Sequence, residues 1–387
     1  MINLAGRDIL HNWGKFVMTG VGLGLLIGVT LTMAGVYRGM VDDAQALIAN
    51  SGADLWVVQQ DTLGPYAEPS AIHDDVARDL LLQPGVMATG NVAYLTMQIQ
   101  HAEQEVRIML VGIEADKPGT PAYLISGRPI TQSHYEALAD IKSGLNLGER
   151  IRIRRHEYTV VGLTRRMVSS SGDPMIFVPI KDAQEVQFLK DNDALLNERA
   201  RTTAPSRLPG AISPATSQMV NAVLVQLKPG FLDEEVAASI RRWKHLQSYT
   251  RAQMEEILVA RLIATSAKQI FMFLVILSIV SAAIVAFIIY TMTMNKIREI
   301  AVLKLIGAGN RIISLMILQQ ALGLGLIGFV VGKTAATFWA PLFPKYVLLI
   351  PGDALRGFFL VMVMCALASS FAIRAALRVD PASAIGG

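Results

Sequence analysis

Four runs of apolar residues, each long enough to cross a lipid bilayer, constrain this chain more than any other feature. They cover residues 16–36, 270–294, 312–338 and 355–373. A transmembrane helix needs about 20 predominantly apolar residues to cross the hydrocarbon. The 387-residue sequence is 52% hydrophobic but only 17% charged, and the apolar excess is concentrated in these runs. We therefore expect four transmembrane helices rather than one large soluble core.

Two of these runs carry features that need a separate interpretation. The run at 16–36 is interpreted as an uncleaved signal anchor, because its apolar core is longer than that of a signal peptide and no A-x-A cleavage site follows. Lys333 lies near the expected outward end of the third run. The simplest interpretation is that its ammonium group reaches the membrane interface, and a role inside a dimer is the alternative.

The placement of lysine and arginine residues predicts how these helices are oriented. Cytoplasmic segments carry an excess of these residues close to the ends of the spans. Residues 1–15, 295–311 and 374–387 are basic, whereas the loop 339–354 contains only Lys345. The basic residues expected inside the cell are Arg7, Lys15, Lys296, Arg298, Lys304, Arg311, Arg374 and Arg378. We therefore expect both termini and the segment between the second and third spans to be cytoplasmic.

The segment between the first and second spans, residues 37–269, is too long for a loop and predicts a folded extracytoplasmic domain. Apolar residues at helical spacing predict helical stalks at 36–49 and 251–268. Between them, β-branched or alternating stretches and two helical patches indicate an α+β domain of two subdomains. The expected strands are 54–60, 92–100, 105–112, 150–154, 158–163, 176–179 and 222–227, and the expected helices are 72–83 and 234–243. Residues 191–218, rich in Ala, Arg, Pro, Ser and Thr, are expected to form a mobile insertion or an extended hairpin.

No group of residues typical of catalysis or metal binding stands out. The outer region holds five histidines, none at the spacing of a zinc site, and the single cysteine, Cys365, lies in an apolar run. Residues 328–334 read GFVVGKT, but the glycines are one residue too close for a phosphate-binding loop, and the stretch lies in a span. Close packing between helices explains these glycines better. We expect a non-catalytic chain without a cofactor or a metal, and its net charge of +4 does not suggest nucleic-acid binding.

The cytoplasmic segment 295–311 is the most informative part of the sequence. Its residues 296–311 read KIREIAVLKLIGAGNR, with Ile297, Ile300, Ala301 and Lys304 on one helical face. Two glycines, at positions 307 and 309, are expected to end this helix before the third span. Either a docking helix or an amphipathic turn resting on the lipid headgroups would show this composition.

Residues 298–309 (REIAVLKLIGAG) resemble the signature that MacB/FtsX-type ABC transporter permeases carry between their second and third spans. The tail, residues 373–385 (IRAALRVDPASAI), is similar to the closing motif of that family. Residues 4–28, which lead into and begin the first span, are similar to the corresponding segment of that family. Weaker similarities in the middle fall at residues 127–128, 147–149 and 158–162. Because no ATPase is part of this chain, it resembles the members with separate subunits, such as lipoprotein-releasing or DevC-like permeases.

This resemblance implies a multi-pass protein of the bacterial inner membrane that works as a homodimer with two cytoplasmic ABC ATPase subunits. ATP and Mg²⁺ would be bound by the ATPase, which would dock on a coupling helix in the 295–311 segment. The docking residues that the resemblance implies are Arg298, Glu299, Ile300, Leu303, Lys304 and Gly307. A membrane-fusion adaptor and membrane lipids are the further partners that it suggests.

Three functions are compatible with the sequence. The first is extrusion of a hydrophobic or lipid-like substrate, driven by mechanical transmission to the outer domain. The second is an FtsX-like transmembrane signal relay that activates an extracytoplasmic partner without transport. The third, a membrane-tethered enzyme, has the least support because no catalytic constellation is present.

Overall fold

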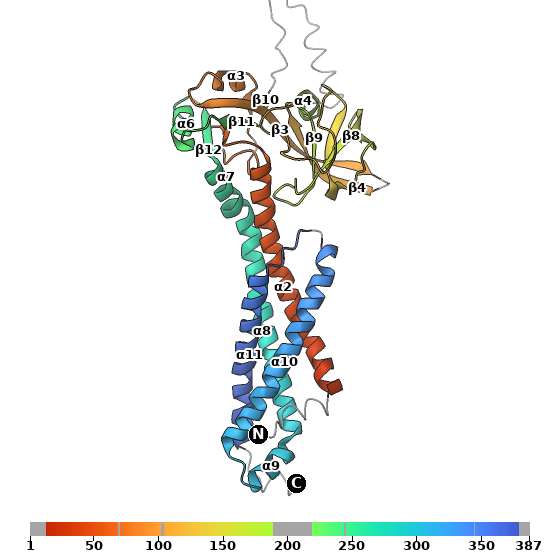
Figure 1. Cartoon of the computed structure of the whole chain (residues 1–387), viewed down its shortest axis with the longest axis vertical. Helices are drawn as coiled ribbons and strands as arrows, with labels where there is room; N and C mark the ends of the chain where they lie inside the picture. Colours follow the sequence, from red (N-terminus) through yellow and green to blue (C-terminus); the bar gives the residue numbers. More distant parts are fainter. Residues whose placement is uncertain are drawn as a thin grey trace, which may run out of the picture. The chain divides into compact units, whose positions relative to one another are not determined.

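The structure is a computed structural model whose contacts divide the chain into two compact units (Figure 1). The membrane unit consists of residues 1–40 and 265–387, and the outer unit of residues 41–264. The structure describes residues 13–68, 70–101, 104–188, 219–243, 245–343 and 345–378. The insertion expected at 191–218 lies outside the described residues, as do most of the 1–15 segment and of the 374–387 tail.

Long helices dominate the membrane unit. Its helical elements are α2 (Trp13–Asn50, of which the last ten residues belong to the outer unit), α8 (Ala264–Asn295), α9 (Ile297–Leu305), α10 (Asn310–Trp339), η3 (Ala340–Leu342) and α11 (Pro351–Arg378). The four longest, α2, α8, α10 and α11, are long and apolar enough to cross a membrane. A helix is the favoured form there because hydrocarbon offers no partner to the backbone N–H and C=O groups. Each of the four expected spans lies within one of these helices.

Glycines allow α2 and α10 to approach each other closely. A Cβ atom placed on Gly24 would lie 2.7 Å from the side chain of Val331, and one on Gly332 would lie 2.6 Å from the carbonyl oxygen of Gly24. Further along the same contact, the indole Nε1 of Trp339 donates a hydrogen bond of 2.7 Å to the hydroxyl of Thr32. Small residues at such positions let helix backbones gain van der Waals contact that larger side chains would prevent. The interpretation of the GFVVGKT glycines as packing positions within a helix is confirmed.

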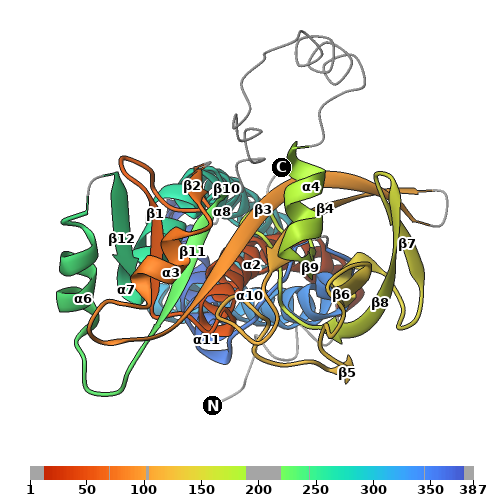
Figure 2. The ribbon, with the colours of Figure 1, turned by 90° about the horizontal axis from the view of Figure 1, so that it is seen from above.

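The outer unit is built on one mixed ten-stranded sheet (Figure 2). The strands are β1 (Leu55–Gln59), β2 (Ile72–His73), β3 (Val86–His101), β4 (Gln104–Ile113), β5 (Ser126–Gly127), β6 (Glu136–Asp140), β7 (Arg150–Ile153), β8 (His156–Thr164), β9 (Met175–Pro179), β10 (Met219–Val220), β11 (Ala222–Leu227) and β12 (Leu246–Thr250). The sheet order is β12-β1-β11-β3-β4-β9-β6-β8-β5, with β7 paired to β8, while β2 and β10 form a separate pair. The β4–β9 and β6–β8 pairs are parallel, and the other pairs are antiparallel.

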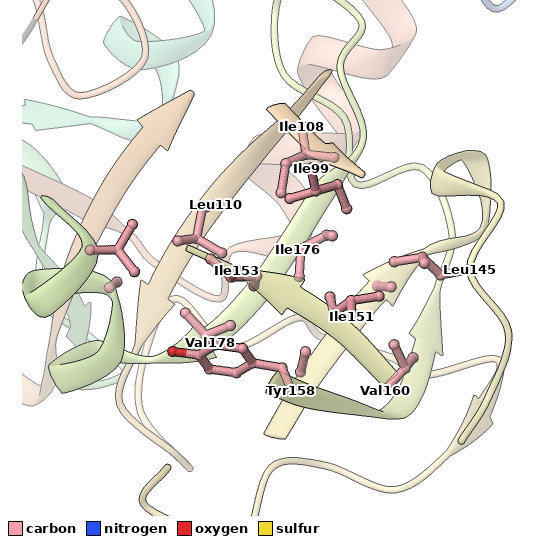
Figure 3. Packing of buried hydrophobic residues seen from close by; sticks show 14 of the residues in the cluster. Ile99, Ile108, Leu110, Leu145, Ile151, Ile153, Tyr158, Val160, Ile176 and Val178 are labelled. Carbon is pink, nitrogen blue, oxygen red and sulfur yellow. The ribbon is translucent and has the colours of Figure 1, made fainter. Parts of the chain in front are cut away.

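Two hydrophobic cores lie along this sheet. The helical elements of the unit are α3 (Val76–Leu80), η1 (Ile141–Ser143), α4 (Ile180–Phe188), α6 (Asp233–Ile240), α7 (Arg251–Ile257) and the π-helical η2 (Leu258–Ile263). One core joins β1 and β11 to α3 and α6 around Leu80 and Ile240. The other joins strands β3, β4 and β6–β9 to α4, and its side chains, among them Ile153 and Tyr158, point toward one another (Figure 3).

The seven expected strands are confirmed. Two stretches of the outer unit, 72–83 and β6, have a secondary structure that was not expected. The expected helix at 72–83 is instead strand β2 followed by the short helix α3. Strand β6 was not expected, because its sequence EALAD consists of residues typical of helices. The strand is fully buried, and its Glu136 carboxylate pairs with Arg128. Tertiary contacts therefore override the local preference at this strand.

Replacing Gly24 by leucine should destabilise the membrane unit by about 1–3 kcal/mol, because the larger side chain overlaps Val331. Gly22, two residues earlier on the same helix, has no atom within 4 Å of the position that a Cβ would take. Gly22→Leu is therefore the matched control and should leave stability unchanged. Denaturation of the purified chain in lipid nanodiscs measures the difference, and equal effects of the two substitutions would contradict the close contact.

Candidate coupling site

The loop expected to carry the coupling helix forms α9, which lies between α8 and α10 in the chain (Figure 1). Its end is fixed by Gly307, whose φ of 96° lies in the left-handed region. The backbone N–H groups of Ala308 and Gly307 donate to the carbonyls of Leu303 (2.9 Å) and Lys304 (3.1 Å). This pair of bonds is the Schellman ending that favours glycine. The expected helix end at Gly307 is confirmed.

One face of α9 is packed into the membrane unit. Ile300 and Ala301 are each only 2% exposed, and Ile300 belongs to a core cluster that includes Ala376 of α11. Lys304 donates from its Nζ to the carbonyl oxygens of Ala376 (3.4 Å) and Leu377 (3.0 Å). A cation at this position satisfies carbonyls of the last helical turn and interacts favourably with the helix dipole. Ile300 and Lys304 therefore anchor α9.

The opposite face of α9 is exposed. Arg298 and Glu299 both lie there. Their apolar neighbours Val302, Leu305 and Ile306 are 45%, 64% and 79% exposed. These three were not among the residues selected from the sequence, which favoured the face of Ile300 and Lys304. The helical spacing of residues 298, 302 and 305 indicates a second face of α9. Spacing alone does not show which of the two faces packs against the rest of the membrane unit.

A second candidate element lies in the outer unit, where the last turns of α2 meet the sheet. The guanidinium of Arg166 donates to the Asp42 carboxylate and, at 3.2 Å, to the Asp42 carbonyl oxygen. Arg166 Nε lies 4.0 Å from the Asp43 carboxylate, and Lys142 Nζ lies 3.6 Å from the other oxygen of that carboxylate. Two acidic residues of one helix are therefore paired with two basic residues that follow strands β6 and β8.

Asp140 holds both basic residues in place. Its side chain is fully buried and accepts from the backbone N–H of Lys142 (2.9 Å) and of Met167 (2.8 Å). Burial raises the pKa of the Asp140 carboxyl, while these two backbone hydrogen bonds act in the opposite direction. Arg166 itself has a φ of 63°, so its backbone conformation is one that side-chain-bearing residues seldom adopt. We call Asp42, Asp43, Asp140, Lys142 and Arg166 the ionic ring.

The described residues contain no group of His, Cys, Asp or Glu side chains that could hold a metal ion. Three histidines make single carboxylate pairs instead: His101 with Glu149, His134 with Asp182 and His156 with Glu185. Within the part of the chain that the structure describes, the two features that stand out are therefore helix α9 and the ionic ring. Neither of them contains a nucleophile with an adjacent base.

The fold and these elements define a multi-pass membrane protein with an α+β outer unit and a short helix between its second and third long helices. Residues 16–243 match the family model of the MacB-like periplasmic core domain, and residues 271–381 match the FtsX-like permease C-terminal model. The chain therefore belongs to the MacB/FtsX-type ABC transporter permeases. The permeases of this type work with a partner ATPase.

Two known relatives align with this chain over its full length. An uncharacterized ABC transporter permease of Mycobacterium tuberculosis is 25% identical over 100% of both chains, and one of Mycobacterium bovis is 24% identical over 100% of both. The periplasmic region of MacB from Actinobacillus actinomycetemcomitans aligns with a TM-score of 0.36 at 12% identity, over 54% of this chain and 94% of that one. The extracellular domain of the noncanonic ABC-type transporter YknZ from Gram-positive bacteria aligns with a TM-score of 0.33 at 13% identity, over 51% and 99%.

Replacing Arg166 by glutamine should loosen the last turns of α2, because it removes the charge that pairs with Asp42. The ion pair is about one-third exposed on both sides, so its loss should lower the local opening free energy by about 1 kcal/mol. Hydrogen exchange of residues 41–50 in the full chain should then become roughly fivefold faster. The neighbouring Arg165→Gln, at an exposed position, is the control. Equal acceleration in both variants would show that the ring does not hold the helix.

Proposed function

We propose that this permease couples ATP hydrolysis on a partner ATPase to extrusion of a hydrophobic or lipid-like substrate. The single observation that carries this proposal is helix α2, which belongs to both units. Its residues 13–40 make the glycine contacts with α10, and its residues 42 and 43 enter the ionic ring. A helix is stiff over this length because every interior turn is hydrogen-bonded, so it can pass a displacement from one end to the other.

In this proposal, the coupling helix is α9, and it receives the motion of the ATPase. The exposed face of α9 would contact the ATPase through Arg298, Glu299 and the apolar side chains of Val302, Leu305 and Ile306. The other residues implied by the family resemblance would support that face. Ile300 and Lys304 would transmit force into the core and α11, the half-buried Leu303 would lie between the two faces, and Gly307 would fix the angle at which the chain enters α10.

The other components of the proposed complex are inferred from membership of the family. The functional assembly would contain two permease chains and two ATPases in the bacterial inner membrane, with residues 37–269 on the extracytoplasmic side. ATP and Mg²⁺ would be held by the ATPase, and a membrane-fusion adaptor would receive the substrate outside. The basic residues at both ends of the cytoplasmic loop support this orientation.

A transmembrane relay is the second candidate, because the continuous helix α2 would serve either function. In a relay, the same motion of α2 would alter the outer unit so that an extracytoplasmic protein is activated. The two functions differ in one measurable property. Extrusion predicts ATP turnover that rises with a lipophilic substrate, whereas a relay predicts ATP turnover that responds only to the extracytoplasmic partner.

Replacing Ile306 by aspartate should reduce ATP turnover of the permease–ATPase complex by tenfold or more, because it places a charge in the centre of an apolar contact. Leu342 has the same exposed fraction, 79%, and lies in η3, which follows the opposite end of α10, so Leu342→Asp is the matched control. Both variants should fold, since neither side chain is covered. Turnover and co-purification of the ATPase are measured together in nanodiscs.

The Ile306→Asp complex should lose bound ATPase, and the Leu342→Asp complex should keep it. Charge reversal by Glu299→Lys should give a smaller loss in the same direction, since a rim charge contributes less than a central apolar residue. Normal assembly and normal turnover in Ile306→Asp would remove α9 as the docking site.

A further inference from the structure

The outer unit contains a polar cavity where its two hydrophobic cores meet. The volume of the cavity is about 310 Å³, at the lower end of the range for small-molecule sites. Helix α3 of one core and helix α4 of the other both line it, and both contact strand β3 (Figure 2). Its charged side chains are Asp74, Arg78, Glu114, Lys117 and Lys181, and Asn91 also lines it.

Asn91 supplies this cavity with a buried hydrogen-bond acceptor. Its side chain is only 6% exposed, and its Nδ2 donates to the Asp74 carbonyl oxygen (3.0 Å) and to Glu114 Oε1 (3.0 Å). These two bonds fix the amide, and its Oδ1 has no hydrogen-bond partner among the described residues. Buried amide oxygens are seldom left unpaired, because desolvation without a compensating bond costs free energy. A ligand with a hydrogen-bond donor would satisfy this oxygen.

Two cations of the lining, Arg78 on α3 and Lys181 on α4, are exposed and unpaired. Within the part of the chain that the structure describes, neither side chain makes a hydrogen bond or an ion pair. Lys117, by contrast, pairs with Glu114. Guanidinium and ammonium groups are the side chains that bind phosphate and carboxylate groups most strongly. The two helices therefore offer free positive charge to an anion in the cavity.

We propose that this cavity binds a small hydroxylated organic anion, namely a sugar that carries a phosphate or a carboxylate group. Arg78 and Lys181 bind the anionic group, and a hydroxyl of the ligand donates to Asn91 Oδ1. The Asp74 carboxylate accepts from a further hydroxyl, because an ionised carboxylate acts only as an acceptor. The site lies wholly in the outer unit and requires no ATPase, so it goes beyond the proposed function without depending on it.

A zwitterion such as a short peptide is a less suitable ligand. Glu114 is already paired with Lys117, so a ligand ammonium group would find only the Asp74 carboxylate as a counter-ion. The described lining carries three cations and two carboxylates, and this balance attracts a ligand of net negative charge. Hydroxyl groups donate to the acceptors of the lining without adding positive charge.

Binding of such an anion would also link the two cores. Arg78 belongs to the helix of one core and Lys181 to the helix of the other, and Ile180, beside Lys181, packs against both cores. A ligand shifts a protein toward the arrangement to which it binds more tightly. An anion that contacts both cations would therefore favour the arrangement in which α3 and α4 close on the cavity.

Isothermal titration calorimetry of the full chain in phosphatidylcholine nanodiscs tests this site. The probes are glucose 1-phosphate and glucuronate, with glucose as the uncharged control. At least one of the two anions should bind with a Kd below about 1 mM, and about tenfold more tightly than glucose. Lys181→Gln and Arg78→Gln should each weaken this binding about tenfold, and Lys181→Arg should preserve it. Lys228→Gln removes an exposed lysine of the outer unit that does not line the cavity, and it should leave binding unchanged.

Hydrogen exchange shows where the ligand binds. At a ligand concentration about ten times the Kd, amides of α3 and α4 that exchange when the cavity opens should exchange about tenfold more slowly, because binding stabilises the closed form by the factor 1 + [L]/Kd. At the same concentration, Lys181→Gln should show only about twofold slowing.

Four outcomes would overturn the proposal: no binding of either sugar anion, equally tight binding of inorganic phosphate, tighter binding of glycylglycine, or an equal loss in Lys228→Gln. Substrate-stimulated ATP turnover, measured separately on the permease–ATPase complex, reports on the proposed function. Failure of one therefore does not imply failure of the other.

Discussion

The close contact between α2 and α10 is the interaction on which the membrane unit depends. Without side chains at Gly24 and Gly332, the two backbones come near enough for a Cβ on Gly332 to fall 2.6 Å from a carbonyl oxygen. In hydrocarbon the hydrophobic effect does not drive helices together, so packing contact of this kind must hold them. The same helix continues to Asp42 and Asp43, which belong to the ionic ring. Helix α2 therefore takes part both in the glycine contact with α10 and in the ionic ring.

Charged groups stabilise two elements of the chain, helix α9 and the last turns of α2 in the outer unit. At α9, Lys304 satisfies the final carbonyls of α11, so the short helix is fixed to a long one. In the outer unit, the buried Asp140 binds two backbone N–H groups and so positions Lys142 and Arg166 against α2. Directional hydrogen bonds and ion pairs resist sliding more than apolar contacts do, because they are lost with small displacements. Both elements are therefore held more firmly in place than apolar contacts alone would hold them.

Much of the candidate coupling site could be predicted from the sequence, but its orientation could not. The amphipathic pattern gave α9, and Gly307 gave its end, since only glycine adopts a φ near 96° without strain. The sequence did not show which face of α9 is exposed. Ile300 and Lys304, expected at the docking surface, lie inward, whereas Val302, Leu305 and Ile306 are exposed. The ionic ring was not predicted at all. Asp42 and Arg166 are 124 residues apart in the chain, and no local pattern links them.

The sequence by itself determined the four spans, the short helix α9 and seven strands, because hydrophobic periodicity and glycine position are local signals of local structure. The tertiary structure decided what depends on distant partners. It turned EALAD into the buried strand β6, covered one face of α9 and paired Asp42 with Arg166. These outcomes depend on which surfaces meet, and contact free energies between distant segments exceed the small differences in local propensity.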